Sequence, residues 1–499
     1  MKNSKKKSVS SSSKQVVVVE EEEEPVSPTG RLMHSPKFNI SIILIMGYYT
    51  KIDPNLYKKC MHQTLLKHPR FTSIPMKKNG KFRWKRTTVD IEKHSFVPDV
   101  DPNMESPDGF VAEFASNLSR IPMDMTKPLW EFYILNVKTS DAESVVVARL
   151  HHSLGDGVSL IALTHACARK IDDPDSLPVF PLSKKEKKKG GDRGLLMTFF
   201  ALLWTLILIV SYTLIDIPVF IATMLFVRDA QTPIKVERGR VPSQNRFVHR
   251  IVSLADVKLV KTAMNVSIND VILGVTEAGL SRYLTTIYEN KKEKGKKSTG
   301  GSLPRNLGIR STVVFNLRPT PTIEDLVEMM EKEKLNGMWG NLIGIVILPL
   351  KIVVQDDPLT YIRRAKSTMD RKKLSLVHKC AFVVMKLAMS LFGIEVASRM
   401  VTAVFRNTTL TFSNVMGPKE EVNLFGHHLS YIAPSVYGFP QSMVVHYQSY
   451  GDKLVISIGA DGKLIPNPHQ LCDDFIRSLQ NIKEAVIERG LVDVASQFC

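Results

Sequence analysis

His151, His152 and Asp156 are the residues of this sequence whose types and spacing could do chemistry. They follow a β-branched run in the stretch VVVARLHHSLGDGVSLIAL, residues 145–163, and two glycines flank the aspartate. Imidazole can bind a metal ion or accept a proton near neutral pH, and a nearby carboxylate can orient the ring. The stretch therefore allows three interpretations: a metal site, a catalytic base, or a structural turn.

A metal site is the least favoured of the three. Successive side chains on a strand point to opposite faces, so His151 and His152 at the end of one strand cannot easily share a metal ion. The sequence also has no HExxH motif and no cluster of histidine and cysteine. We therefore expect no metal.

A single histidine directed into a channel is a different candidate. An ordinary imidazole, with a pKa of about 6.5, is mostly neutral at cytosolic pH and can accept a proton from an alcohol. Asp156 could fix the tautomer of that ring or tie down the loop backbone, and Gly155 and Gly157 would let the chain turn sharply beside it. The residues alone leave open the alternative of a capped turn whose buried histidines are satisfied by backbone groups.

Several motifs of other enzyme classes are missing. The sequence has no GxSxG elbow, no Walker A loop and no GxGxxG loop, which disfavours lipase-like, NTPase and dinucleotide-binding functions. A catalytic base without a nucleophile motif suits the direct transfer of an acyl group that is already activated, such as a thioester.

Size and charge indicate the architecture and the kind of partner. A globular chain of 499 residues is too long for one average core, so we expect two domains or two large lobes. The formal charge of +18 favours anionic lipid headgroups or a phosphate-bearing cofactor, unless the basic loops only aid solubility. No zinc-finger spacing, RNP-like motif or basic heptad helix is present, so we expect no nucleic-acid partner.

Cysteine usage and the N-terminus indicate the compartment. The five cysteines lie far apart without a CxxC pair, which suits a reducing environment. The N-terminal MKNSKKKSVSSSSKQ lacks the apolar core of a secretory signal. Most of the chain is therefore expected on the cytosolic side.

Four regions follow from the patterning along the chain. Residues 1–24 predict a disordered tail, and residues 25–183 a first lobe that contains a hairpin of strands 128–137 and 144–152 and a helix after Val158. Residues 184–240 form a basic, glycine-rich linker and an apolar segment. Residues 241–499 predict a second lobe of mixed strands and helices, with helices at the SINDVILGV stretch and around 358–373 and 470–488.

The apolar segment spans residues 195–227. Its first 21 residues carry no charge, which reaches the roughly 20 residues needed to cross a bilayer. A buried core helix is the alternative, but the adjacent lysine cluster favours a membrane, with the beginning of the segment on the cytosolic side.

The sequence resembles the plant-type wax ester synthase/diacylglycerol acyltransferase family. HHSLGDG matches the HHxxxDG signature of the wider acyltransferase and condensation-domain superfamily. EPVSPTGRLMHSP, PLWEF, SINDVILGV, VVFNLRP, MWGNLIG and SNVMGP occur in the order and spacing of that plant-type family. The resemblance covers nearly everything from Pro25 to the C-terminus, and the DFGWG-like signature of the phenolic acyltransferases is missing.

The resemblance implies a fold and a base. It implies a mixed α/β fold of two chloramphenicol-acetyltransferase-like lobes, a pseudo-dimer with a central tunnel and an inserted membrane anchor. His152, the second histidine of the motif, would be the general base in that tunnel. Asp156 would mainly be a structural partner of an arginine, for which Arg318 is our candidate, and His151 and Gly157 would shape the loop.

The resemblance also points to an ND pair in the second lobe, Asn269 and Asp270. A helix cap plus a loop contact is an equally good explanation of these two residues. No residues for binding a cofactor can be assigned.

The implied activity is O-acyl transfer from acyl-CoA, a co-substrate, without a permanently bound cofactor. The acceptor would be a long-chain fatty alcohol, giving a wax ester, with diacylglycerol as a second acceptor giving triacylglycerol. Two alternatives remain: transfer to another hydroxylated acceptor, and a catalytically silent lipid-binding protein of the same fold.

The order of the motifs constrains the membrane segment. The histidine motif precedes the apolar segment and the ND pair follows it, so both lobes must lie on one side of the bilayer to share an active site. Two crossings would need about 40 apolar residues. We therefore expect a shallow hairpin that bends near IDIP, residues 215–218, or an interfacial anchor. The expected location is the endoplasmic reticulum membrane with the lobes facing the cytosol, the plasma membrane being the alternative.

Overall fold

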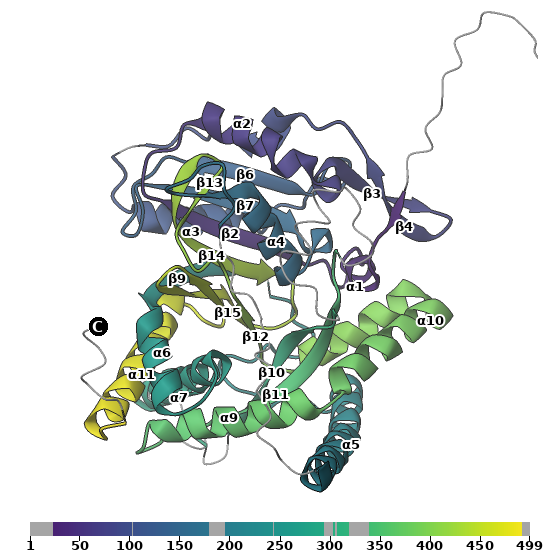
Figure 1. Cartoon of the computed structure of the whole chain (residues 1–499), viewed down its shortest axis with the longest axis vertical. Coiled ribbons are helices and arrows are strands. Elements are labelled where there is room, and N and C mark those ends of the chain that lie inside the picture. Colours follow the sequence, from purple (N-terminus) through teal and green to yellow (C-terminus); the bar gives the residue numbers. More distant parts are fainter. Residues whose placement is uncertain are drawn as a thin grey trace, which may run out of the picture.

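Two lobes, each built on its own sheet, make up the protein (Figure 1). The computed structural model describes residues 23–101, 103–178, 195–242, 244–293, 303–304, 307–318 and 339–491. Helices and strands mix in both lobes, which confirms the predicted fold class. The predictions for residues 1–22 and for the linker before residue 195 lie outside the described residues.

The N-terminal lobe contains a seven-stranded sheet. Its strands, in spatial order, are β5 (Ser95–Phe96), β6 (Trp130–Leu135), β7 (Ser144–His151), β2 (Ser41–Tyr48), β14 (His427–Tyr437), β13 (Val422–Leu424) and β8 (Ala168–Lys170). The predicted hairpin is confirmed, because β6 and β7 pair antiparallel. All eight residues of β7 are buried, including Arg149, which pairs with the buried Glu131 at 2.5 Å.

Two strands of this sheet come from the second half of the chain. β14 pairs antiparallel with β2, from Leu429 opposite Tyr48 to Tyr437 opposite Ser41. In Figure 1 the yellow-green β13 and β14 lie among the purple and blue strands of the N-terminal lobe. Residues 422–437, which belong to the predicted region 241–499, therefore extend the sheet of the N-terminal lobe, because strand pairing and not chain order decides membership of a sheet.

The C-terminal lobe contains a six-stranded sheet. Its strands, in spatial order, are β11 (Ile343–Ile352), β10 (Leu307–Asn316), β12 (Leu410–Val415), β15 (Met443–Tyr450), β16 (Lys453–Asp461) and β9 (Asn245–Ser253). One face packs on helices to form the core of this lobe: α6 (Leu254–Ala263), α7 (Ile268–Glu293), α9 (Leu359–Leu374) and α11 (Pro468–Glu488). The helices predicted at SINDVILGV, 358–373 and 470–488 are confirmed.

Shorter elements complete the N-terminal lobe. A small sheet has the order β1 (Glu24–Pro25), β4 (Lys81–Arg86), β3 (Ser73–Lys78). The helices are α1 (Pro28–Leu32), α2 (Pro54–Gln63), α3 (Pro107–Leu118) and α4 (Gly157–Cys167), with 3-10 turns at η1 (Leu65–Lys67), η2 (Pro69–Thr72), η3 (Ile91–Lys93) and η4 (His152–Leu154). Glu24, the last residue of the predicted tail, belongs to β1, and its carboxylate accepts a 2.6 Å hydrogen bond from the buried Arg70.

The apolar segment is one continuous helix, α5 (Leu195–Leu225), and the predicted hairpin is wrong. Pro218 lies inside the helix, which loses one hydrogen bond there but continues to Leu225. The charge of Asp216 does not interrupt the helix, because Arg371 and Lys372 of α9 satisfy it. Its carboxylate accepts hydrogen bonds from Arg371 at 2.7 Å and from Lys372 at 2.8 Å. The alternative of an interfacial anchor is taken up below.

A second long apolar helix packs beside α5. This helix, α10 (Val377–Asn407), contains a kink at Gly393, whose φ of 82° is accessible to glycine without strain. Both helices are long and apolar enough to cross a membrane by length and composition alone. Figure 1 shows them together at the edge of the C-terminal lobe.

Candidate active site

The two histidines of the motif have different surroundings. His151, the last residue of β7, is buried; its Nδ1 lies 2.7 Å from Ser153 Oγ, its Nε2 lies 3.1 Å from Asn39 Oδ1, and its ring stacks on His34. His152 begins the turn η4 and lines a cavity of about 390 Å³ between the lobes. Of the two rings, only that of His152 lines the cavity.

Asn341 sets the tautomer of His152. The Asn341 side chain donates from Nδ2 to the backbone carbonyl of His152 at 2.8 Å, which orients the amide. Its Oδ1 then lies 3.2 Å from His152 Nδ1, and because this oxygen can only accept, Nδ1 carries the proton. The lone pair of His152 is therefore on Nε2, which has no hydrogen-bond partner among the described residues.

Asp156 is the centre of a buried network that joins the lobes. Its carboxylate caps α4 by accepting from the Ser159 N–H at 3.1 Å, and it also accepts from the Leu342 N–H at 3.0 Å. Arg318 donates to the same carboxylate at 2.8 Å, to Ser159 Oγ at 2.9 Å and to the Gly340 carbonyl at 2.7 Å. The predicted contact of Asp156 with Arg318 is present, and it holds the loop rather than the His152 ring.

The two glycines of the motif matter because they lack a side chain, and not because they adopt unusual backbone dihedrals. Gly155 has a φ of 175°, an extended value open to any residue, and a Cβ there would approach the Ser159 Cβ to 2.9 Å. A Cβ on Gly157 would lie 3.3 Å from Val415 of the C-terminal lobe. The expectation that they let the chain turn sharply is wrong; they let neighbouring segments approach the loop closely.

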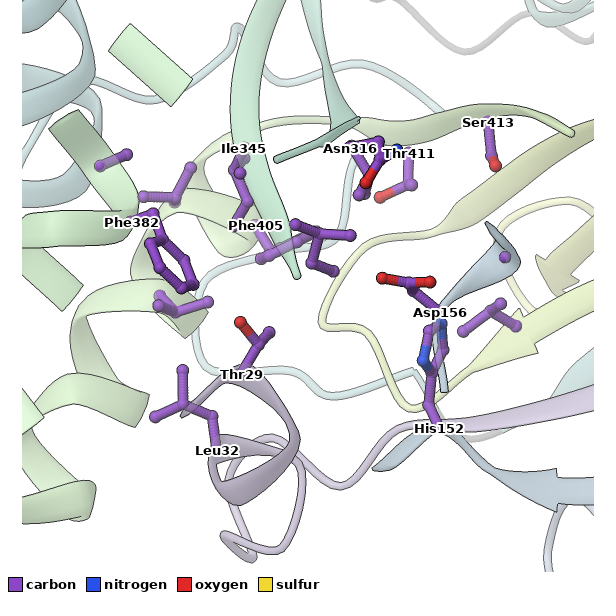
Figure 2. Close-up of a pocket in the computed structure, with 18 of the residues that line it drawn as sticks. Thr29, Leu32, His152, Asp156, Asn316, Ile345, Phe382, Phe405, Thr411 and Ser413 are labelled. Atoms are coloured by element: carbon purple, nitrogen blue, oxygen red, sulfur yellow. The ribbon is translucent and has the colours of Figure 1, made fainter. Parts of the chain in front are cut away.

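The cavity has a polar end and an apolar end. Figure 2 shows His152 and Asp156 at one side, with Asn316, Thr411 and Ser413 of the C-terminal sheet nearby. Phe382 and Leu32 lie at the other side, in a part of the wall that α10 and α1 supply. A chain-like lipid fits this arrangement, with its polar group at the histidine.

The ND pair is divided between two roles. Asn269 lines the cavity, and its Oδ1 accepts a 2.7 Å hydrogen bond from Asn414 of the SNVMGP stretch. Asp270 instead accepts from the backbone N–H and the hydroxyl of Ser267, both at 2.7 Å, and thereby closes the first turn of α7. Asp270 thus forms a capping box with Ser267, which caps the helix, and Asn269 makes the loop contact.

Sequence reasoning missed two residues of this site, Asn341 and His446. Asn341 lies in the MWGNLIG stretch, but its position in that stretch gave no sign of a bond to His152 from a distant part of the chain. His446 lines the cavity from β15, where it is one polar residue in an alternating strand. The alternation of side chains along β15 could have indicated His446, because it places every second residue on the face of the sheet away from the core.

Comparison with known proteins identifies the family. The family model described as the wax ester synthase/diacylglycerol acyltransferase catalytic domain matches residues 55–272, and the WS/DGAT C-terminal domain matches residues 339–483. Wax ester synthase/diacylglycerol acyltransferase 11 of Arabidopsis thaliana is 45% identical over 475 residues, covering 94% of this chain and 96% of the relative. The chain belongs to the wax ester synthase/diacylglycerol acyltransferase family. The predicted resemblance is confirmed, and this family member is an acyl-CoA-dependent O-acyltransferase.

Solved structures share the two-lobed fold of this family member. The wax ester synthase/diacylglycerol acyltransferase from Marinobacter aquaeolei VT8 aligns with a TM-score of 0.57 at 16% identity, covering 93% of this chain and 99% of that chain. The starter condensation domain of rhizomide synthetase, crystallised in complex with C8-CoA and Leu-SNAC, aligns with a TM-score of 0.50 at 11% identity, covering 93% and 94%. At these identities the likeness concerns the fold alone.

The acyltransferase uses acyl-CoA as its co-substrate, as the family does. The part of the chain that the structure describes holds no group of three or more histidine, cysteine, aspartate or glutamate residues placed to bind a metal ion.

The pH dependence of this wax ester synthase/diacylglycerol acyltransferase family member should reflect the burial of His152. Burial lowers the pKa of His152 from 6.5, and Asp156 and Asn341 offset that effect only in part. Only the neutral ring can accept a proton, so kcat/KM should fall as the pH is lowered, with a midpoint below the 6.5 of an ordinary imidazole. A pH profile of kcat/KM with a midpoint at or above 6.5 would contradict this.

Proposed function

We propose that this protein transfers a fatty acyl group from acyl-CoA to the hydroxyl of a long-chain fatty alcohol, and also to diacylglycerol, with His152 as the general base. The observation that carries the proposal is the tautomer of His152 in the cavity, where Nδ1 faces the Asn341 oxygen and Nε2 is unpartnered among the described residues. An unpartnered Nε2 lone pair is what a general base needs.

The proposed reaction needs no nucleophile from the protein. Nε2 of His152 takes the proton of the acceptor hydroxyl while its oxygen attacks the thioester carbonyl. The tetrahedral intermediate then expels the thiolate of CoA, which takes the proton back from the imidazolium, so that an ester and free CoA leave. Asp156 and Arg318 contribute by holding the loop that carries His152 in place.

The test is a release assay with purified protein. Palmitoyl-CoA is supplied with hexadecanol, with diacylglycerol or with no acceptor, and both free CoA and lipid products are quantified. We expect CoA release only when an acceptor is present, in equal amount to wax ester or triacylglycerol. Release of CoA without an acceptor, or no release with either acceptor, would contradict the proposal.

We also propose that α5 and α10 bind the membrane surface from the cytosolic side of the endoplasmic reticulum. Their large apolar side chains are exposed, including Phe199 and Trp204 on α5, each 60% exposed, and Phe392 on α10, 66% exposed. Such a patch is larger than a soluble monomer usually leaves in water. The four described cysteines are free, which fits a compartment that keeps thiols reduced.

The cavity supports this arrangement because the same two helices line it. Phe220 and Met224 of α5 and Phe382 and Met385 of α10 contribute to its wall. A lipid acceptor could thus move from the bilayer to the cavity between apolar surfaces, without passing through water. Topology mapping that placed Lys189 and Arg238 on opposite sides of the membrane would contradict this arrangement.

Membrane binding should depend on the exposed face of α5. Replacing Phe199, Trp204 and Leu214 together by glutamate should weaken binding to phosphatidylcholine–phosphatidylserine vesicles more than about 100-fold, because each buried side chain contributes roughly 1.5–3 kcal/mol. Sedimentation with vesicles measures the effect.

The matched control for this variant carries the same added charge elsewhere. Val97, Ile121 and Met125 are also exposed apolar residues but lie in the N-terminal lobe, away from α5 and α10. Their triple replacement by glutamate should leave vesicle binding within about threefold of the wild type. Equal losses in the two triple variants would show that charge and not apolar contact is responsible, and would overturn the proposal.

A further inference from the structure

The sheet of the C-terminal lobe has one apolar face and one face with buried polar residues. Along β15, Met443, Val445 and Tyr447 belong to the apolar core of the lobe. His446 lies between them and therefore points to the opposite face, where it lines the cavity. The alternation of side chains along β15 thus places the imidazole of His446 at the cavity, on the C-terminal lobe, opposite the lobe that carries His152.

His446 has no hydrogen-bond partner for either ring nitrogen among the described residues. The side chain is only 7% exposed, so it is more than nine-tenths buried. Burial, with a smaller contribution from the His152 ring, lowers the pKa of His446 to about 3, so the ring is neutral and offers one donor and one acceptor. Buried polar groups normally have a partner, and a group that lines a cavity can find it in a ligand.

The neighbours of His446 do not satisfy it. Ser413 on β12 and Ser457 on β16 lie directly opposite His446 in the strand register, on the same face of the sheet. The Ser457 hydroxyl is itself buried and unpartnered. The described part of the cavity wall includes Ser413 and His446 but not Ser457. In the row Ser413, His446, Ser457, the cavity therefore ends at His446.

The geometry of the cavity indicates which ligand atom meets His446. The apolar end of the cavity, where Figure 2 shows Phe382 and Leu32, suits the chain of an acceptor lipid whose hydroxyl lies at His152. Nε2 of His152 engages the hydrogen of that hydroxyl, which leaves the unpartnered His446 ring to meet a second polar atom of the acceptor. A fatty alcohol has no such atom, whereas diacylglycerol carries an ester oxygen on the adjacent carbon.

We propose that His446 binds a second oxygen atom of the acceptor, on the carbon next to the hydroxyl that His152 deprotonates. The inference rests on the proposed function and deepens it, because it makes His446 a specificity-determining residue. A bound fatty alcohol leaves the imidazole of His446 unpaired, whereas a vicinal diol or diacylglycerol supplies a partner for it. A site built to hydrogen-bond a polar group disfavours the analogue that lacks it.

The test compares two acceptors that differ by one oxygen, 1-hexadecanol and 1,2-hexadecanediol. With palmitoyl-CoA as donor, kcat/KM is measured for esterification of the primary hydroxyl, and the affinity of each acceptor is measured separately by titration without acyl-CoA. In His446→Leu the preference for the diol over the alcohol should fall about tenfold, within the range of one buried hydrogen bond. The readout is the ratio of kcat/KM for the two acceptors, and diacylglycerol should follow the diol.

Two further variants make the result specific. His446→Gln keeps a donor and an acceptor and should restore most of the diol preference. Ser457→Ala removes the neighbouring hydroxyl outside the cavity wall and should leave the preference unchanged. The melting temperature of His446→Leu should equal or exceed that of the wild type, because the variant removes a buried unpaired group.

Other outcomes overturn the inference. Equal losses of kcat/KM with both acceptors would place His446 in a step common to them, such as binding of the acyl donor. Unchanged kcat/KM with both acceptors would show that it touches neither. A wild type that binds the diol more tightly but esterifies neither acceptor would contradict the proposed function and not the subsite, because the titration is independent of turnover.

Discussion

Replacing His152 by alanine should lower kcat/KM by about 10²- to 10⁴-fold, the range that a positioned general base contributes, while the protein keeps its fold. The fold should survive because the ring lies at the cavity and makes one side-chain hydrogen bond, to Asn341. Release of CoA in the presence of hexadecanol measures the activity, and thermal melting measures the fold.

His428 provides a matched control for this variant. Its ring is partly exposed and pairs with Glu421 at 2.9 Å, outside the described cavity wall. His428→Ala should therefore leave kcat/KM within about twofold. A His152→Ala protein that turns over at the wild-type rate would remove the base from the proposed mechanism, whatever its melting temperature.

Replacing Arg318 by methionine should lower the free energy of unfolding by about 3–5 kcal/mol, the cost of removing one partner of a buried ion pair. The Asp156 carboxylate is 4% exposed and the Arg318 side chain is fully buried, so the remaining charge cannot reach water. The Gly340 carbonyl and the Ser159 hydroxyl would also lose a donor. Urea denaturation measures the loss, and activity should fall with it because the His152 loop loses its support.

Controls for this prediction separate burial from charge. Lys138 and Glu143 form an ion pair of 2.6 Å whose side chains are 73% and 51% exposed, and Lys138→Met should cost less than about 1 kcal/mol. Combining Arg318→Met with Asp156→Asn should recover part of the loss, because the unpaired charge is then gone. If Arg318→Met costs no more than Lys138→Met, the network does not hold the lobes together.

Local patterning determined most of the secondary structure of this chain. The β-branched run before His151 and the apolar period after Ile268 depend on neighbours a few residues away, and these elements appear where they are expected. The residues of the HHxxxDG stretch left a catalytic base and a structural turn open, and the choice of His152 as the candidate base came from the family resemblance. The contact of Asp156 with Arg318 came from the family resemblance, since no local signal joins residues 162 positions apart.

The apolar segment shows where local reasoning failed. A charge at Asp216 and a proline at Pro218 predict a bend in an isolated helix, but Arg371 and Lys372 of α9 satisfy the carboxylate and the helix continues. The partner helix α10 was missed because lysine and arginine interrupt its apolar pattern.

The sequence by itself determined the family, the order of most elements and the identity of the candidate base. Only the tertiary structure decided that β14 completes the N-terminal sheet, that Asn341 sets the tautomer of His152, and that His446 faces the same cavity. The physical reason is that periodicity and capping act over a few residues, whereas a cavity between lobes depends on strand pairings and hydrogen bonds between segments more than a hundred residues apart. Those pairings are stabilised by burial in the assembled fold, which no single stretch of the chain encodes.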